Sequence, residues 1–99
     1  MSKIFLCNKK DLKNLCGKKI EIDEVEIAVF KIDDEYFATG NVCPHQKFRK
    51  LFEGSCENGK ITCPMHGWKF DLRTGVGENG KINIYNLTVE DEKIFVELN

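Results

Sequence analysis

Two short motifs hold the residues of this sequence that could bind a metal together. The first is Cys43-Pro44-His45 and the second is Cys63-Pro64-Met65-His66, and between them they contain both histidines of the chain. Thiolate sulfur and imidazole nitrogen are ligands that zinc, copper and iron accept. A proline follows each cysteine and restricts the backbone, so we expect both motifs in loops. If those loops are neighbours, two thiolates and two imidazoles converge on one site.

Short β-rich runs separated by polar turns must position these loops. The runs predicted as strands are residues 3–6, 19–22, 26–32, 36–38, 60–62, 68–71, 81–85, 87–90 and 93–98. Each motif falls between two such runs, at the end of a hairpin. One short helix is predicted over residues 10–16, opened by Asp11 and closed by Gly17. The sequence therefore predicts an all-β, antiparallel fold.

Alternating apolar residues indicate which strand faces build the core. Those expected to share a face are Val25, Ile27 and Val29 in one strand and Ile94, Val96 and Leu98 in another. Hairpin turns are predicted at Asp33-Asp34 and Asp91-Glu92, although neither pair contains the Gly typical of a two-residue turn. The stretch 76–80 is predicted as a loop.

Length and composition limit the classes of protein to which the chain can belong. A chain of 99 residues forms a single domain. Its 15 basic and 16 acidic residues give a net charge of -1, which excludes the basic surface of a nucleic-acid-binding domain. The apolar runs are far shorter than the ~20 residues that span a membrane, so we expect a cytoplasmic protein without a membrane partner. Five cysteines without an export signal favour metal binding over a disulfide framework.

Three other interpretations of the two motifs compete with a four-ligand metal cluster. Structural zinc accepts two Cys and two His, but it favours a Cys pair followed by a His pair instead of two Cys-His pairs. A catalytic thiol needs one base and one orienting group, not two matched pairs. Chance placement leaves the proline after each cysteine unexplained. A zinc-stabilised interaction module remains open as the alternative from a different class.

The two motifs resemble the ligand pattern of the Rieske family, whose 2Fe-2S cluster has two Cys on one iron and two His on the other. The similarity covers roughly residues 18–98. It includes Tyr36-Phe37-Ala38 before the first motif, Leu51 and Glu53-Gly54 after it, and Gly67-Trp68, Phe70-Asp71 and Thr74-Gly75 after the second. The resemblance implies that Cys43 and Cys63 bind the inner iron. It implies that His45 and His66 bind the outer, reducible iron through Nδ1.

The resemblance also implies an architecture and a function. The fold is expected to be an antiparallel Rieske-type β-sandwich or barrel, with a cluster-binding subdomain of two hairpin loops at about residues 41–72 and a base formed by residues 1–40 and 73–99. The chain looks like a small, low-potential ferredoxin of ring-hydroxylating dioxygenase systems. Such a protein is a soluble one-electron carrier, not an enzyme, between a reductase and an oxygenase-like terminal enzyme. The small subunit of an assimilatory nitrite reductase is the alternative within the fold.

Other residues near the motifs have more than one possible role. A basic cluster beside His45 is either a docking site for an acidic redox partner or a solvated loop; it comprises Lys47, Arg49 and Lys50. Trp68 is expected to pack as a lid over the second loop. The three cysteines outside the motifs are expected to be unpaired thiols with structural roles; they are Cys7, Cys16 and Cys56.

Overall fold

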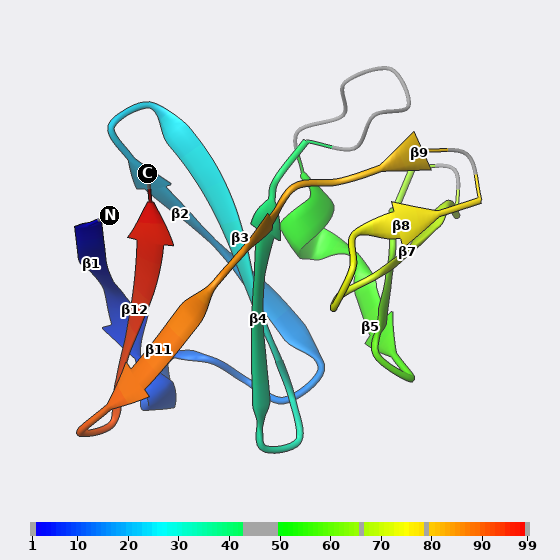
Figure 1. Cartoon of the computed structure of the whole chain (residues 1–99). Helices are drawn as coiled ribbons and strands as arrows, with labels where there is room; N and C mark the ends of the chain where they lie inside the picture. The colour runs from blue at the N-terminus through cyan, green and yellow to red at the C-terminus, as the bar shows by residue number, and fades with distance from the viewer. Residues whose placement is uncertain (1, 43–49, 66, 79, 99) are drawn as a thin grey trace.

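The computed structural model describes residues 2–42, 50–65, 67–78 and 80–98, which form an all-β structure. The elements in chain order are β1 (Ser2–Asn8), the 3-10 turn η1 (Lys9–Asp11), β2 (Cys16–Ile22), β3 (Val25–Ile32), β4 (Glu35–Gly40), the 3-10 turn η2 (Leu51–Glu53), β5 (Ser55–Glu57), β6 (Lys60–Thr62), β7 (Lys69–Asp71), β8 (Val76–Gly77), β9 (Gly80–Lys81), β10 (Ile84–Tyr85), β11 (Leu87–Glu90) and β12 (Lys93–Leu98). They pair into three antiparallel sheets, β1-β12-β11, β10-β4-β3-β2 and β5-β6-β7-β8-β9 (Figure 1). The predicted antiparallel all-β fold is confirmed. No helix in the described part of the chain is long and apolar enough to cross a membrane.

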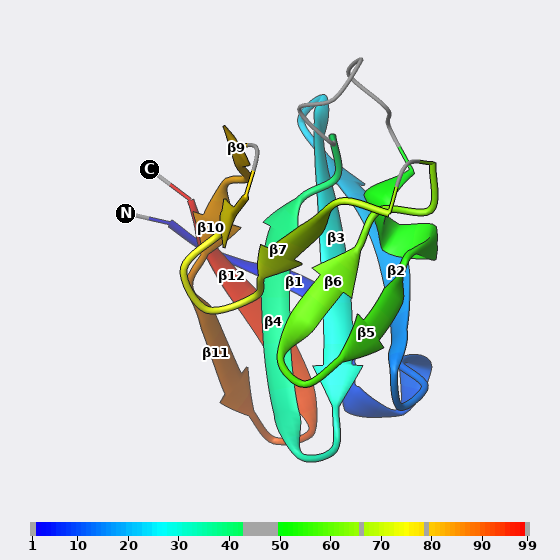
Figure 2. The same ribbon diagram turned by 90° about the vertical axis from the view of Figure 1, so that its right-hand side faces the viewer.

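Strand β3 lies in the middle of the molecule and is buried on both faces, because its residues from 27 to 30 contact two different cores. Ile27 and Val29 belong to the base core, completed by Leu6, Cys7, Leu12, Ala38, Ile94 and Val96. Ala28 and Phe30 belong to the site core, completed by Phe37, Leu51, Cys56, Ile61, Cys63, Phe70, Leu72 and Ile82. The sheet that contains β3 thus separates β1-β12-β11 from the small sheet β5–β9 (Figures 1 and 2).

Both hairpin turns predicted from the sequence are present. Strands β3 and β4 are joined at Asp33-Asp34, with Ile32 paired to Glu35. Strands β11 and β12 are joined at Asp91-Glu92, where the φ angles are 50° and 65°. Two positive φ angles are typical of a type I′ turn, the turn that matches the twist of a hairpin. This hairpin therefore forms without glycine, at the expense of backbone strain.

The helix predicted over residues 10–16 is wrong. Only the 3-10 turn η1 forms, and β2 already begins at Cys16. The Asp11 carboxylate accepts the Asn8 N–H at 3.0 Å, while Leu12 is extended, with φ -107° and ψ 135°. Leu12 is buried in the base core. Burial of the Leu12 side chain, which requires an extended backbone here, contributes more free energy than the weak helical tendency of a short segment.

Other strand predictions need smaller corrections. Val25 is 37% exposed at the start of β3, so it lies outside the base core that contains Ile27 and Val29. The strand predicted over 81–85 is interrupted, because the Ile82 N–H turns away to the Gly75 carbonyl. The stretch predicted as a loop contains a short hairpin of β8 and β9. Strand β5 was not predicted, although the Asn58-Gly59 pair that follows it is a typical hairpin signal.

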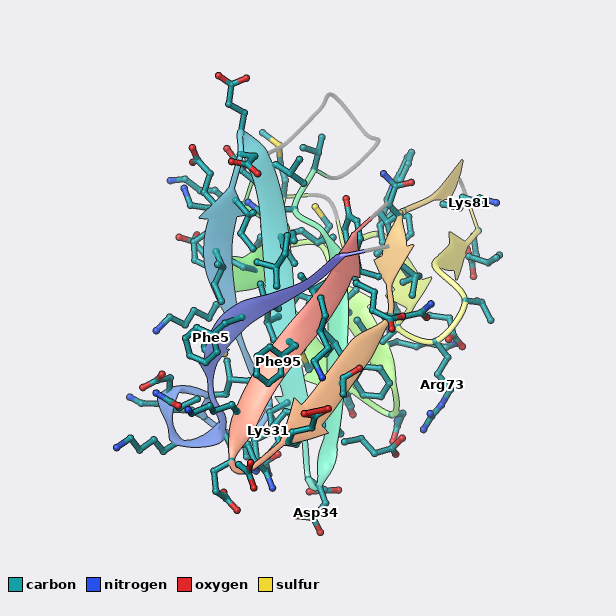
Figure 3. The ribbon with its side chains drawn as sticks, turned by 60° about the vertical axis from the view of Figure 1, so that its left-hand side comes forward. Phe5, Lys31, Asp34, Arg73, Lys81 and Phe95 are labelled. Atoms are coloured by element: carbon teal, nitrogen blue, oxygen red, sulfur yellow. The ribbon has the colours of Figure 1, made fainter. Side chains whose placement is uncertain are left out.

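An aromatic pair lies on one side of the molecule and an exposed ion pair on the other. Phe5 and Phe95 lie side by side on the outer face of β1-β12-β11, with ring centroids 5.8 Å apart (Figure 3). On the other side of the molecule, Arg73 follows β7 and forms an ion pair of 2.7 Å with Glu35, at the start of β4. That pair ties the turn after β7 to the middle sheet, although an exposed ion pair contributes little stability.

Candidate metal centre

Cys63 is the one predicted ligand that falls within the described residues. The other three, Cys43, His45 and His66, lie outside them. The Cys63 side chain is 1% exposed and unpaired, and it belongs to the site core together with Ile61 and Phe70. Cys63 directly follows β6, so its thiol lies in the hydrophobic interior where the hairpin β6–β7 closes.

The backbone closes the second motif into a tight loop. The Cys63 N–H donates to the Trp68 carbonyl at 2.7 Å, and the Cys63 carbonyl accepts the Gly67 N–H at 3.0 Å. Gly67 has a φ of 72°, a conformation that glycine adopts without a steric penalty. Trp68 is half-buried and packs against the site core, so its side chain has the predicted packing role. Main-chain hydrogen bonds therefore hold the two ends of the segment 63–68 together.

A buried side chain, in contrast, holds together the two ends of the first motif. Asn41 directly follows β4, is 0% exposed, and lies two residues before Cys43. Its Oδ1 accepts the Phe52 N–H at 2.9 Å, across the loop. Its backbone carbonyl accepts the Leu51 N–H at 3.2 Å. The residues on either side of the segment 42–50 are therefore held next to each other by Asn41.

A close contact joins the exit of the first motif to the entrance of the second. At Gly54 the backbone lies so near the hairpin β5–β6 that a Cβ atom would overlap the Thr62 carbonyl oxygen. Thr62 immediately precedes Cys63, and its pairing with Ser55 holds β5 and β6 in register. The two predicted ligand loops thus start from one rigid unit, although they are far apart in sequence.

The surface next to both motifs contains exposed apolar side chains and a positive charge. Val42 is 41% exposed and Met65 is 49% exposed, and each directly precedes a predicted ligand. Lys50 is exposed at the end of the first loop. The other members of the basic cluster, Lys47 and Arg49, lie outside the described residues.

Cys7 provides a contrast to Cys63. It is 4% exposed and unpaired, but it lies in the base core. Burial, assisted by Asp11 and opposed by Lys18, raises the pKa of this thiol above its ordinary value of 9.0. A thiol that stays protonated is a poor metal ligand, which supports the predicted structural role. Cys56 is buried in the site core, and the side chain of Cys16 lies outside the description.

The residues of the two motifs fit a 2Fe-2S cluster by their chemistry. Two thiolates and two imidazoles are the donor set of a Rieske centre. The buried, unpaired Cys63 thiol at the end of a hairpin is the placement that an iron shielded from water needs. Among the described residues, no group of three or more His, Cys, Asp or Glu side chains could hold a metal elsewhere.

Two positioning residues were not predicted from the sequence. Asn41 gives no signal as a lone polar residue, because only the fold reveals that it is buried. Gly54 was noted as part of a family-like pair, but its close approach to Thr62 depends on the pairing of β5 with β6. The Asn58-Gly59 turn, which predicts that hairpin, is the signal that could have revealed this contact.

Comparisons with known proteins identify the family. The family model of the Rieske 2Fe-2S domain matches residues 2–84. The chain is 32% identical over 101 residues to the 3-phenylpropionate/cinnamic acid dioxygenase ferredoxin subunit of Photorhabdus laumondii, covering 97% of this chain and 94% of that protein. It is 30% identical to human Apoptosis-inducing factor 3 over 92% of this chain, but spans only 16% of that much longer protein.

Solved structures agree with the fold. The Sphingomonas yanoikuyae B1 ferredoxin matches with a TM-score of 0.88 and 28% identity, covering 99% of this chain and 100% of that one. A nitrite reductase NADPH small subunit matches with a TM-score of 0.87 and 23% identity, over 99% and 100% of the two chains. These matches confirm the predicted Rieske-type architecture.

The same comparisons confirm the predicted cofactor and class of function. The family model is that of a 2Fe-2S domain, and the relatives include a dioxygenase ferredoxin subunit matching 97% of this chain and a naphthalene 1,2-dioxygenase ferredoxin component matching 80% of it. This agrees with a protein that transfers electrons and is not itself the catalytic component. On the family match over residues 2–84, the chain belongs to the Rieske 2Fe-2S domain family.

Proposed function

We propose that this protein is the ferredoxin component of an oxygenase system, and that it carries one electron at a time from a reductase to a terminal oxygenase. Its cluster is held by Cys43 and Cys63 on the inner iron and by His45 and His66 on the outer iron. The observation that carries the assignment is the buried, unpaired Cys63 thiol at the closed end of the second motif. The full-length similarity to a dioxygenase ferredoxin subunit supports the choice of system.

The four side chains divide the work of holding and tuning the cluster. When bound, the cluster supplies reversible one-electron chemistry. Two thiolates offset the positive charge of the iron, and neutral imidazoles in place of two further thiolates leave less negative charge, which favours acceptance of an electron. The site core around Cys63 excludes water from the sulfur side. The imidazoles retain a second ring nitrogen from which a proton can be exchanged with solvent.

Replacing one buried thiol at a time tests the assignment. The Cys63→Ala variant should purify without bound iron and sulfide, because it loses a ligand to the inner iron. Cys7→Ala is the matched control, since it removes an equally buried thiol from the base core. It should retain about two irons and two sulfides per chain. Iron in Cys63→Ala at the wild-type level, or a colourless wild-type protein containing zinc, would contradict the proposal.

The basic cluster of Lys47, Arg49 and Lys50 is our candidate for the docking site of an acidic redox partner. It follows a proposed ligand, and the exposed Val42 and Met65 side chains add apolar surface next to the same motifs. Exposed charges steer association over about a Debye length, ~10 Å at 0.1 M salt, and act mainly on the association rate. Apolar contacts then hold the partner at short range.

Charge reversal tests the docking proposal. In the Lys47→Glu/Lys50→Glu variant, electron transfer to a purified terminal Rieske oxygenase should be slower at low salt, and less sensitive to salt, than in wild type. The matched control is Lys10→Glu/Lys13→Glu, which makes the same change of charge in and after η1, on the far side of the molecule from η2 (Figure 1). Equal rates for the two double variants would show that the basic cluster is only a solvated loop.

Other parts of the assignment follow from this role. We propose a cytoplasmic location. We also propose that residues 41–72 form the cluster-binding subdomain and that residues 1–40 and 73–99 form the base. The nitrite reductase small subunit is the second candidate, supported by similarity of fold. Parallel assays of the reduced protein with an oxygenase and with a nitrite reductase large subunit distinguish the two functions.

A further inference from the structure

We propose that Asn41 is the positioning residue of the first ligand loop, and that its buried amide sets where this loop stands relative to the second. The inference rests on the proposed function, because the loops matter as holders of the cluster. Asn41 is 0% exposed, and burying an amide costs free energy unless it is hydrogen-bonded. A buried amide two residues before a ligand therefore calls for a specific role.

The partners of Asn41 use both ends of its amide. Its Nδ2 donates to a carboxylate oxygen of Glu26 at 3.1 Å, and its Oδ1 accepts the Phe52 N–H at 2.9 Å. A carboxylate can only accept and a backbone N–H can only donate, so the partners fix the orientation of the amide. Asn41 thereby connects β3, the start of the loop 42–50 and η2.

Main-chain hydrogen bonds of the same residue reinforce this connection. The Asn41 N–H donates to the Glu26 carbonyl at 3.2 Å, and the Asn41 carbonyl accepts the Leu51 N–H at 3.2 Å. Leu51 is fully buried in the site core, so the exit of the loop has an anchor of its own. We call the arrangement of Glu26, Asn41 and Phe52 the Asn41 clamp.

The clamp reaches the second ligand loop through η2. Phe52 lies in η2, which ends where the Gly54 N–H donates to the Leu51 carbonyl at 2.9 Å. Gly54 in turn lies against Thr62, the residue before Cys63. A shift of Phe52 would therefore be transmitted to the spacing of Cys43 and Cys63, which must bind the same iron. Groups that orient metal ligands in this way influence both affinity and potential.

Other residue types cannot form the same clamp. Aspartate keeps an acceptor for the Phe52 N–H but places a second carboxylate against Glu26. Leucine leaves both the Phe52 N–H and the Glu26 carboxylate without this partner. Alanine leaves the same groups without this partner and also creates a cavity.

A reciprocal substitution tests the clamp in the cluster-loaded protein. Asn41→Asp should lose its cluster to a chelator about 10-fold to 100-fold faster than wild type, the range typical of groups that support metal ligands. Its reduction potential and its electron paramagnetic resonance signal should also change. In Asn41→Asp/Glu26→Gln, the new amide at position 26 can donate to the new carboxylate, so cluster retention and signal should return toward wild type. Asn86→Asp makes the same change at an exposed position between β10 and β11 and controls for the added charge.

Hydrogen exchange of the cluster-free protein separates this inference from the proposed function. In Asn41→Asp, repulsion between the new carboxylate and Glu26 should pull the acceptor away from the Phe52 N–H, so the Phe52 amide should exchange faster. The Cys63 amide, bonded to a main-chain carbonyl, should not exchange faster. This readout holds even if the protein binds no iron. If Asn41→Asp does not fold, Glu26→Ala gives the same test, because it removes the acceptor at the partly buried end of the clamp. Wild-type exchange at Phe52 and wild-type cluster retention, or no recovery in the double variant, would overturn the inference.

Discussion

The two proposed ligand loops differ in what closes them. Main-chain hydrogen bonds of Cys63 close the second loop, and Gly67 in this loop has a positive φ that favours glycine. The first loop is closed largely by one side chain, the buried amide of Asn41. The closure of the second loop therefore depends little on side chains outside the ligands and Gly67. The closure of the first loop depends on one residue type, so the two closures should respond differently to mutation.

The largest effect is expected where the two loops meet. Gly54→Ala should lower the free energy of unfolding by about 2 to 3 kcal/mol, because the new methyl group would overlap the Thr62 carbonyl and come within 2.9 Å of Ile61 Cδ1. Since Gly54 has an ordinary φ of -71°, this cost is steric. Denaturant unfolding of the cluster-free protein measures it. If Gly54→Ala loses less free energy of unfolding than Gly59→Ala, the contact between Gly54 and Thr62 is not rigid.

A smaller effect is expected from Gly67→Ala. No atom of the described residues lies within 4 Å of the position that its Cβ would take, so the cost comes from the φ of 72° and should be about 1 kcal/mol. Gly59→Ala is the matched control, because Gly59 has a φ of 77° and equally open space in the β5–β6 turn. The two variants should unfold alike, but only Gly67→Ala should speed the loss of the cluster. Equal cluster retention would mean that the closure of the second loop does not depend on Gly67.

The smallest effect concerns the base core, which is remote from both loops. The pKa of Cys7 is raised in the folded protein, so as the pH rises the unfolded chain loses this proton first. The stabilisation from keeping the thiol neutral is complete below about pH 9.0 and is lost as the pH rises above that value. Above that pH, the free energy of unfolding should therefore fall more steeply with rising pH in wild type than in Cys7→Ala. The two curves should run parallel below that pH; a constant offset throughout would argue against a buried neutral thiol.

Much of the fold could be predicted because the strands at the C-terminal end have simple patterns. Residues 87–90 and 93–98 match β11 and β12, since both strands are short, amphipathic and joined by an acidic turn. The strand predicted over residues 26–32 matches β3, but the pattern did not reveal that residues 27–30 are buried on both faces. The pattern failed at residues 10–16, where contact with the base core decides the conformation.

The sequence predicted the chemistry of the candidate site, but not the residues that position its loops. The Cys-His motifs are short and specific, and their donor types limit the metals they suit. Asn41 is different, because its importance lies in contacts with Glu26 and Phe52, residues 15 and 11 positions away. Such contacts cannot be predicted from sequence spacing, because they depend on how the strands and η2 pack together.

The pairing of β1 with β12 has a consequence for how the chain folds. Ser2 lies opposite Leu98, so this sheet joins two strands that are far apart in the sequence. The β2–β3–β4 meander and the β5–β6 hairpin, in contrast, pair residues that are close in sequence. Because closing a long loop costs more entropy and is slower, the local hairpins should form first and β1 should pair with β12 last. The walls of the site core would then be assembled before the sheet of β1 and β12 forms, which would allow iron to be inserted while that sheet is still open.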